Sequence, residues 1–464
     1  MVFSSISFLL FLAVTCCLYH LIPGLRARNI LLLIASLLFY TLGEPVYILL
    51  LLASSVVNYF LARGIAAAGE QESAPDHPTG KSVNFGKTLL TVAVVFNIGL
   101  LVLFKYAGLG LRLPIGISFY TFQTLSYVID VYRGDARVQK RYPDLLLYIT
   151  FFPQLIAGPI VKYHDIADQL AERKTSAEKT ALGLRRFIFG LAKKVLIANT
   201  CAVAVDQIYA LAPEQLCAAS AWTAALLYAL QIYYDFSGYS DMALGMAGMF
   251  GFFLKENFAH PYGATTIKAF WRRWHISLST WFKEYLYIPL GGNRKGATRT
   301  MLNKYIVFFL TGLWHGAGIN FVIWGLIHGT FSVLEERGKW AKRLQGNVIG
   351  WIYTALVVVL AFVFFRAETV GSALTMIRTM FTGFSPSAEA ASLAIRPWDP
   401  YTIAMAVTGA LLMFDWKARL TRSGEKTLSR GLETAGFLLS LGLLVLCVMG
   451  LVSGSYNPFI YFRF

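Results

Sequence analysis

Long runs of apolar residues alternate along this chain with short segments that carry Lys and Arg. Uncharged stretches close to the roughly 20 helical residues that cross about 30 Å of hydrocarbon occur at 45–62, 345–365 and 434–462. Shorter or interrupted candidates lie at 4–22, 29–43, 88–104, 114–129, 144–160, 187–205, 218–234, 305–314, 318–334 and 400–414. The pattern predicts an all-α integral membrane protein with about ten to thirteen membrane-embedded helices.

Composition supports this fold class and indicates which binding partners to expect. Of the 464 residues, 56% are hydrophobic and 14% charged, which excludes an ordinary water-soluble protein. The net charge of +16 lies in short loops beside apolar runs, so it indicates cytosolic loops in a bilayer and no nucleic-acid partner. The five cysteines lack metal-ligand spacing, and we expect no metal site.

We expect one polytopic membrane domain over residues 1–464. Residues 66–86 are small and polar and contain Pro and Gly, which predicts a flexible cytosolic loop. Basic residues at 173–194 predict a cytosolic surface there, and the densest basic segment is 268–299. Residues 264–335, which include that segment, form the expected catalytic core segment.

A helical projection of the segment that starts at Lys268, KAFWRRWHISLSTWFKEYLYIPL, separates apolar from basic side chains. Trp271, Trp274, His275, Leu278, Trp281, Phe282 and Tyr285 share one stripe, opposite Arg272, Arg273, Thr280 and Lys283. This arrangement predicts a helix at the membrane interface with His275 on its inner face. A histidine that only bonds a backbone carbonyl is the alternative interpretation of His275.

Two histidines, His315 and His328, interrupt the apolar run LWHGAGINFVIWGLIHG. An ionisable side chain is energetically costly at membrane depth and usually has a function there. Basic residues flank the run on both sides, and the intervening stretch of about 32 residues has room for two helices of roughly 10 and 17 residues. We therefore expect a re-entrant hairpin broken at Gly316 and Gly318, with His315 at its tip. In one continuous helix the two histidines would lie about 220° apart and could not share a site.

A buried imidazole stays neutral near pH 7 because burial penalises its charged form, so it is suited to take a proton from a hydroxyl. Helix packing without chemistry is the alternative for both His315 and His328. Weaker candidates are the carboxylates and hydroxyls of YYDFSGYSD at the end of an apolar run, and the kinked or broken helix expected at FPQLIAGPIVKYHD.

Five segments together carry a resemblance to a known family. WRRWHISLSTWFKEYLYIPLGGNRKG, followed about 40 residues after His275 by the histidine of LWHGAG, resembles the membrane-bound O-acyltransferase (MBOAT) family. YYDFSGYSDMALGMAGMFGF, FPQLIAGPIV and the ending NPFIYFRF are similar to its bacterial alginate O-acetyltransferase branch. The resemblance covers essentially the whole chain.

The resemblance implies a multi-helix bundle around a central tunnel, with re-entrant and interfacial helices. It implies that His315 is catalytic, because it matches the histidine of the WHG motif, and that His275 lies near the tunnel, because it matches the histidine of RWH. Residues expected to line the tunnel or contact substrate are His328, Asn320, Trp314, Trp271, Asp235, Tyr234, Ser237 and Asp241. Residues expected to bind donor phosphates are Arg272, Arg273, Arg294 and Lys295.

The implied activity moves an acyl group, acetyl in this branch, from a cytosolic thioester to a hydroxyl of a cell-envelope polysaccharide or to a periplasmic partner acyltransferase. The thioester, acetyl-CoA or an acyl carrier protein, is a co-substrate, and no bound cofactor is expected. The implied location is the bacterial inner membrane. Two alternatives remain: transfer of D-alanine from a carrier protein to teichoic-acid-type acceptors, and a proton-coupled transporter whose histidines only relay protons.

Overall fold

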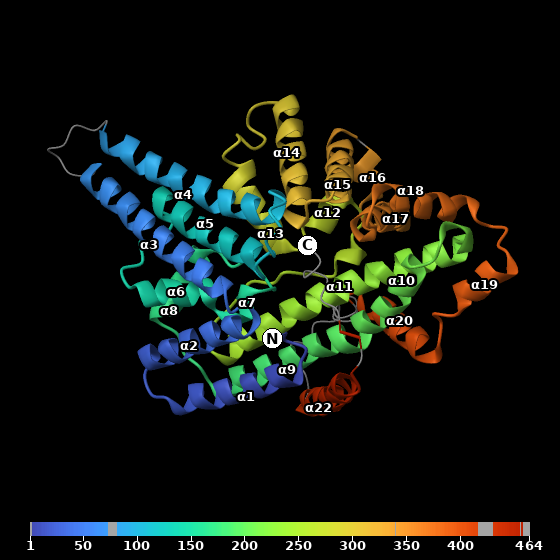
Figure 1. Cartoon of the computed structure of the whole chain (residues 1–464), viewed down its shortest axis with the longest axis horizontal. Helices are drawn as coiled ribbons and strands as arrows, with labels where there is room; N and C mark the ends of the chain where they lie inside the picture. Colours follow the sequence, from blue (N-terminus) through green and yellow to red (C-terminus); the bar gives the residue numbers. More distant parts are fainter. Residues whose placement is uncertain (1, 73–80, 339, 416–429, 455, 458–464) are drawn as a thin grey trace. The chain divides into compact units, whose positions relative to one another are not determined.

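The computed structural model describes residues 2–72, 81–338, 340–415, 430–454 and 456–457. These residues form helices and loops and contain no β-strand. Contacts divide the chain into two compact units (Figure 1). Unit 1 is Met1–Phe187 with Asp241–Lys255, and unit 2 is Ile188–Ser240 with Glu256–Phe464. Two of the three divisions fall within helices α9 (Ala177–Ala192) and α11 (Ala218–Met249), and the third lies in the loop after α11.

Unit 1 is built from helices near the start of the chain. They are α1 (Ile6–Leu21), α2 (Leu25–Gly43), α3 (Tyr47–Glu72), α4 (Lys81–Tyr106), α5 (Ile117–Arg133), α6 (Tyr142–Thr150), α7 (Phe152–Leu155) and α8 (Tyr163–Ala171). A phenylalanine cluster joins several of them: the ring of Phe39 lies 5.6 Å from Phe8 and 5.9 Å from Phe152. Aromatic packing of this kind fixes α1, α2 and α7 against one another.

Two predictions about unit 1 can be compared with these helices. The predicted loop 66–86 is wrong at both ends, because α3 continues to Glu72 and α4 begins at Lys81. The alanines of this segment favour helix more than its glycines oppose it. Residues 73–80 of the loop lie outside the described residues. The expected break in FPQLIAGPIV is confirmed, since α6 ends at Thr150 and α7 has only four residues.

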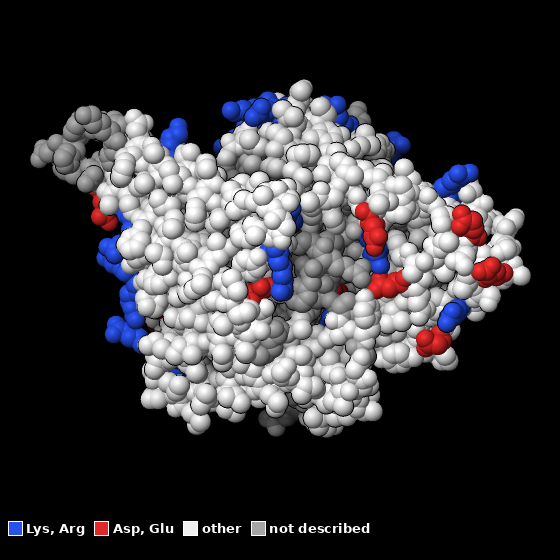
Figure 2. Space-filling model, viewed as in Figure 1, with Lys and Arg blue, Asp and Glu red and all other residues white. Residues whose placement is uncertain are grey.

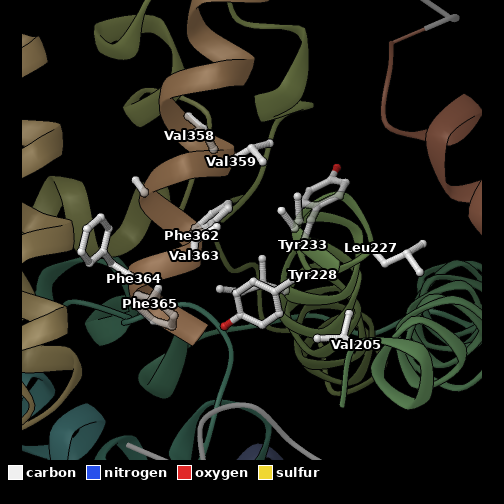
Figure 3. Packing of buried hydrophobic residues seen from close by; sticks show 14 of the residues in the cluster. Val205, Leu227, Tyr228, Tyr233, Val358, Val359, Phe362, Val363, Phe364 and Phe365 are labelled. Carbon is white, nitrogen blue, oxygen red and sulfur yellow. The ribbon is translucent and has the colours of Figure 1, made fainter. Parts of the chain in front are cut away.

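Unit 2 contains the remaining helices, with two π-helical segments, η1 (Lys193–Ala198) and η4 (Lys283–Tyr287), and two short 3₁₀ turns, η2 (Pro213–Gln215) and η3 (Pro261–Gly263). Its α-helices are α10 (Asn199–Tyr209), α12 (Ile267–Trp271), α13 (Ile276–Phe282), α14 (Ala297–His315), α15 (Ile319–Arg337), α16 (Trp340–Leu344), α17 (Val348–Arg366), α18 (Val370–Thr382), α19 (Ala388–Ile395), α20 (Pro400–Leu412) and α22 (Arg430–Val452). Figure 3 shows part of its core, where Phe362 of α17 lies on the side that faces Tyr228 of α11. The rings of Tyr228 and Phe362 lie 6.3 Å apart and nearly perpendicular.

Within the described residues, six helices are long and apolar enough to cross a membrane. They are Leu25–Gly43, Tyr47–Glu70, Asn84–Tyr106, Ala177–Tyr209, Val348–Arg366 and Thr434–Val452. Each overlaps an apolar run of the sequence, so the predicted all-α membrane fold is confirmed. The larger predicted number of membrane-embedded helices includes shorter apolar helices such as Ile6–Leu21 and Pro400–Leu412.

Helices α14 and α15 form the hairpin that carries two of the candidate histidines (Figure 1). The break lies where the sequence predicts it, between His315 and Ile319. The predicted arm lengths are wrong, because each helix has 19 residues. At 1.5 Å per residue each arm is about 28 Å long. Helix α14 gains its extra turns by beginning at Ala297 and including charged residues that the apolar pattern leaves out.

Candidate active site

The segment that begins at Lys268 is not one helix. Helix α12 ends at Trp271, and α13 begins at Ile276 after His275, whose φ of 44° lies in the left-handed region. A residue with a Cβ atom reaches this region only when its surroundings hold it there, and such strain gathers at functional sites. Here the backbone N–H of Ile276 donates to the carbonyl of Asn257 at 2.9 Å, which helps to hold the bend. The expected burial is nevertheless confirmed, since His275 is buried and Arg272 is exposed.

Asn257 sets the tautomer of His275. The Oδ1 atom of Asn257 accepts the backbone N–H of Ser277 at 3.2 Å and the Ser277 hydroxyl at 2.8 Å, and its Nδ2 donates to Ser240 Oγ at 3.0 Å. Because Oδ1 is an acceptor, the His275 Nδ1 that lies 3.2 Å from it must carry the proton. The other ring nitrogen, Nε2, therefore keeps its lone pair. Nε2 is buried and has no hydrogen-bond partner among the described residues.

His315 is the last residue of α14 and is buried at the turn of the hairpin. Its ring lies 4.8 Å from Trp314, 5.0 Å from Trp324 and 5.1 Å from Phe365, each in an edge-on arrangement. The two arms approach closely because Gly325 of α15 has no side chain: a Cβ atom there would overlap the carbonyl oxygen of Phe308. This close approach brings Trp324 against His315.

The three candidate histidines, His275, His315 and His328, are linked through two tryptophan rings. Trp314 lies 6.0 Å from His275 and 4.8 Å from His315, and Trp324 lies 5.0 Å from His315 and 5.2 Å from His328. The sequence predicts that the break at the glycines lets His315 and His328 converge. The structure places both histidines in contact with the indole ring of Trp324. His275 is linked to His315 through the second indole ring, that of Trp314.

His328 is fully enclosed by aromatic side chains. Its ring stacks on Phe270 at 6.0 Å and meets Trp271 edge-on at 5.2 Å. Both of its ring nitrogens and the indole N–H groups of Trp271 and Trp324 are buried without a hydrogen-bond partner among the described residues. Buried polar atoms in native proteins are nearly always bonded, so such a cluster marks a place for water or a ligand.

The remaining tunnel candidates occupy different environments. Asn320 Nδ2 donates to the carbonyl of Ala367 at 2.6 Å, at the start of α15. The Tyr234 hydroxyl donates to the Gly409 carbonyl at 2.6 Å, and Asp235 forms a buried ion pair of 2.8 Å with Lys194. These contacts give all three residues structural partners, and their role toward substrate stays a prediction.

The motif YYDFSGYSD lies inside a helix that continues beyond it, because α11 ends only at Met249. Ser237 is buried within this helix. Asp241 belongs to unit 1, where Arg186 donates to its Oδ1 through Nε at 3.0 Å and Nη2 at 2.8 Å. The residue of this motif that meets a candidate histidine is Phe236, whose ring lies 4.6 Å from that of His275.

The four candidate donor-binding residues, Arg272, Arg273, Arg294 and Lys295, are all exposed. Figure 2 shows Lys and Arg side chains gathered at the edge of unit 2 where α14 begins and α15 ends. The two ends lie together because Lys304 forms an ion pair with Glu336. Exposure and charge make this edge a suitable surface for an anion.

Sequence reasoning missed two residues. Asn257 belongs to no motif, and its amide is brought to His275 by the fold alone. Lys194 is predicted to lie at the cytosolic surface, which is wrong: its side chain is 1% exposed because Asp235 neutralises it within the core of unit 2. A lysine and an aspartate in two separate apolar runs are a signal that could have suggested the pair.

Comparison with known proteins identifies the family. Residues 135–336 match the model of the membrane-bound O-acyltransferase family, and this range includes all three histidines. The chain is 36% identical to the "Probable alginate O-acetylase AlgI" of Pseudomonas putida over 100% of both chains. It is 34% identical to the "Peptidoglycan O-acetyltransferase" of Helicobacter pylori over 93% of this chain and 91% of the relative. It is 28% identical to the "Teichoic acid D-alanyltransferase" of Bacillus subtilis over 54% and 66%, respectively. The chain therefore belongs to the membrane-bound O-acyltransferase family and is an O-acyltransferase.

Proposed function

We propose that this enzyme takes an acetyl group from a cytosolic thioester and delivers it across the bacterial inner membrane to a hydroxyl. The acceptor is a cell-envelope polysaccharide or a periplasmic partner acyltransferase that completes the transfer. The relatives named for alginate and peptidoglycan O-acetylation match at 34–36% identity over more than nine-tenths of the chain, which favours this substrate class.

The observation that carries the proposal is the cluster of three buried histidines linked by Trp314 and Trp324. His315 takes the proton of the acceptor hydroxyl while the hydroxyl oxygen attacks the thioester carbonyl carbon. The carbon–sulfur bond then breaks, and His315 returns the proton to the leaving thiolate, so an ester and a free thiol are formed. General-base help of this kind is worth about 100- to 10,000-fold in rate. His275, with its Nε2 lone pair, is the second candidate for the same proton.

The aromatic surroundings suit a thioester reaction. The rings of Trp314, Trp324 and Phe365 pack around His315, and a shell of this kind excludes water that would hydrolyse the donor. The exposed, positively charged side chains of Arg272, Arg273, Arg294 and Lys295 suit the phosphates of coenzyme A or an acidic carrier protein.

The test is transfer by the purified protein in lipid nanodiscs with radiolabelled acetyl-CoA and with acetylated carrier protein, with and without a polysaccharide acceptor. We expect acceptor-dependent release of the free thiol from one of these donors. His315→Gln should abolish it, His275→Ala should reduce it substantially and His328→Ala should reduce it less. His20→Gln is the matched control, because His20 lies on exposed surface in α1.

Three outcomes contradict the proposal. A folded His315→Gln protein that keeps more than about a tenth of wild-type turnover shows that the proton is taken elsewhere. Consumption of D-alanyl carrier protein with no use of acetyl donors favours the teichoic acid type of reaction. Proton uptake by liposomes with no thioester consumed favours a transporter.

A further inference from the structure

A cavity of about 280 Å³ lies within unit 2, away from the histidine nitrogens. Helices α11, α12, α17 and α20 and the turn η3 supply its walls. The lining residues are Leu226, Ala229, Leu230, Pro261, Tyr262, Phe270, Trp351, Thr354, Ala355, Val358, Val359, Ala410 and Met413. Figure 3 shows two of them, Val358 and Val359, on the α17 surface that faces α11.

The lining offers no polar side-chain group to a ligand. Its three polar side chains all donate to backbone carbonyls: Trp351 Nε1 to Tyr262 at 2.9 Å, the Thr354 hydroxyl to Gly350 at 2.8 Å, and the Tyr262 hydroxyl to Ala229 at 2.5 Å. A polar ligand would lose its hydration here without gaining hydrogen-bond partners, which is unfavourable in an apolar setting. The chemistry of the cavity therefore selects a hydrocarbon.

One residue of the cavity lining also reaches the surface of unit 2. Leu226 lines the cavity and is 52% exposed, while Ile352 of α17 and Val407 of α20, on the same helices as its walls, are each 53% exposed. Helix α17 is one of the helices that are long and apolar enough to cross a membrane. Apolar side chains this exposed on a membrane helix face acyl chains, so a neighbouring lipid can insert a chain into the cavity without crossing water.

One wall connects the cavity to the active site. Phe270 lines the cavity, and its ring also stacks on Trp274 at 5.4 Å and on His328 at 6.0 Å. Phe270 lies on α12, five residues before the strained backbone of His275. Whatever fills the cavity therefore supports the ring that packs against His328.

We propose that this cavity binds one acyl chain of a bilayer phospholipid and that the bound chain supports the aromatic layer beneath His328. An unfilled apolar cavity leaves its lining atoms without van der Waals contacts on one side, which destabilises the surrounding structure. A lipid chain restores those contacts with material that the bilayer always supplies. The site is distinct in chemistry from the histidine cluster, since it holds a chain by packing alone.

Photo-crosslinking tests this proposal on the whole protein in nanodiscs. The probe is a phosphatidylethanolamine that carries a diazirine near the end of one acyl chain, and peptide mass spectrometry locates the adducts. We expect adducts on lining residues of α11, α17 and α20. Ala410→Phe and Ala355→Phe, which fill the cavity from two different helices, should remove those adducts. Ala404→Phe on α20 is the control, because Ala404 is exposed and does not line the cavity.

The outcomes separate the possible occupants and do not depend on the acyltransferase assay. Adducts on the lining that disappear in the filled variants and persist in the control support the proposal. Adducts spread evenly over all lipid-facing helices, or none at the lining, overturn it. Labelling of the lining by a diazirine acyl-CoA and not by the phospholipid also overturns it, because the cavity would then hold a donor chain. If the filled variants do not fold, the wild-type adduct map alone decides.

Discussion

Replacing Asn257 with Ala should impair turnover more than it impairs substrate binding. The Asn257 side chain makes four polar contacts, three through Oδ1 to His275 and Ser277 and one through Nδ2 to Ser240. Each hydrogen bond contributes about 0.5–1.5 kcal/mol, so the loss of all four should lower the free energy of unfolding by roughly 2–6 kcal/mol. His275 would also lose the acceptor that keeps the proton on Nδ1, and the proton could occupy Nε2 instead.

Loss of a group that orients a functional histidine typically costs about 10- to 100-fold in activity. We therefore expect kcat for thioester consumption to fall by at least about tenfold in Asn257→Ala, with little change in KM. Asn257→Asp should restore much of kcat, because a carboxylate still accepts from His275 Nδ1 and from Ser277, and the Ser240 hydroxyl can rotate to donate to it. A purely structural role would predict no such rescue.

The control for this experiment is Asn303→Ala. Asn303 is also fully buried in unit 2, and its Nδ2 donates to the Gly292 carbonyl at 2.9 Å. Its replacement should lower stability without a comparable loss of kcat. A folded Asn257→Ala protein with more than about half of wild-type kcat would refute the positioning role, since an unfixed tautomer should cost more than this.

Three further predictions concern topology, packing and pH. A cysteine in place of Lys295 should react with impermeant reagents only after the inner membrane is opened, because basic loops stay in the cytosol. Gly325→Leu should reduce the folded yield, because its side chain would overlap the Phe308 carbonyl and overpacking costs about 1–3 kcal/mol or more. The pKa of His164 is raised to about 9, mainly by its hydrogen bond to Asp130 and then by its hydrogen bond to Asp165. The stability that His164 contributes is therefore complete below the usual histidine pKa and is lost as the pH rises toward 9. Melting temperatures at pH 6 and above pH 9 should therefore differ less in His164→Gln than in the wild type.

Each of these predictions has a contradicting result. Labelling of Lys295→Cys in intact cells would show that this loop lies outside the cytosol, which contradicts the predicted topology. A normal folded yield of Gly325→Leu would show that the two arms of the hairpin can separate. Gly318→Leu is the control, because the nearest atom to a Cβ atom on Gly318 is 3.5 Å away. Parallel melting curves for His164→Gln and wild type at all pH values show that the ion pair in unit 1 adds no stability.

Much of the membrane fold follows from the sequence, because hydrocarbon requires every backbone group to be paired within its own helix. A long apolar run then has one stable structure, and six such runs are helices of the expected kind in the described residues. The break at Gly316 and the burial of the stripe that contains His275 are local consequences of residue type and helical period, so both were predictable.

The tertiary structure alone decides which side chains meet. Helical period predicts one helix through Trp271 and Trp281, whereas pairing with the Asn257 segment breaks it at His275 and turns the imidazole toward Phe236. The burial of Lys194 and the contacts around His328 likewise depend on partners distant in sequence. A sequence specifies each helix through interactions three or four residues apart, but the histidine cluster consists of contacts between separate helices, and these form only when the helices pack.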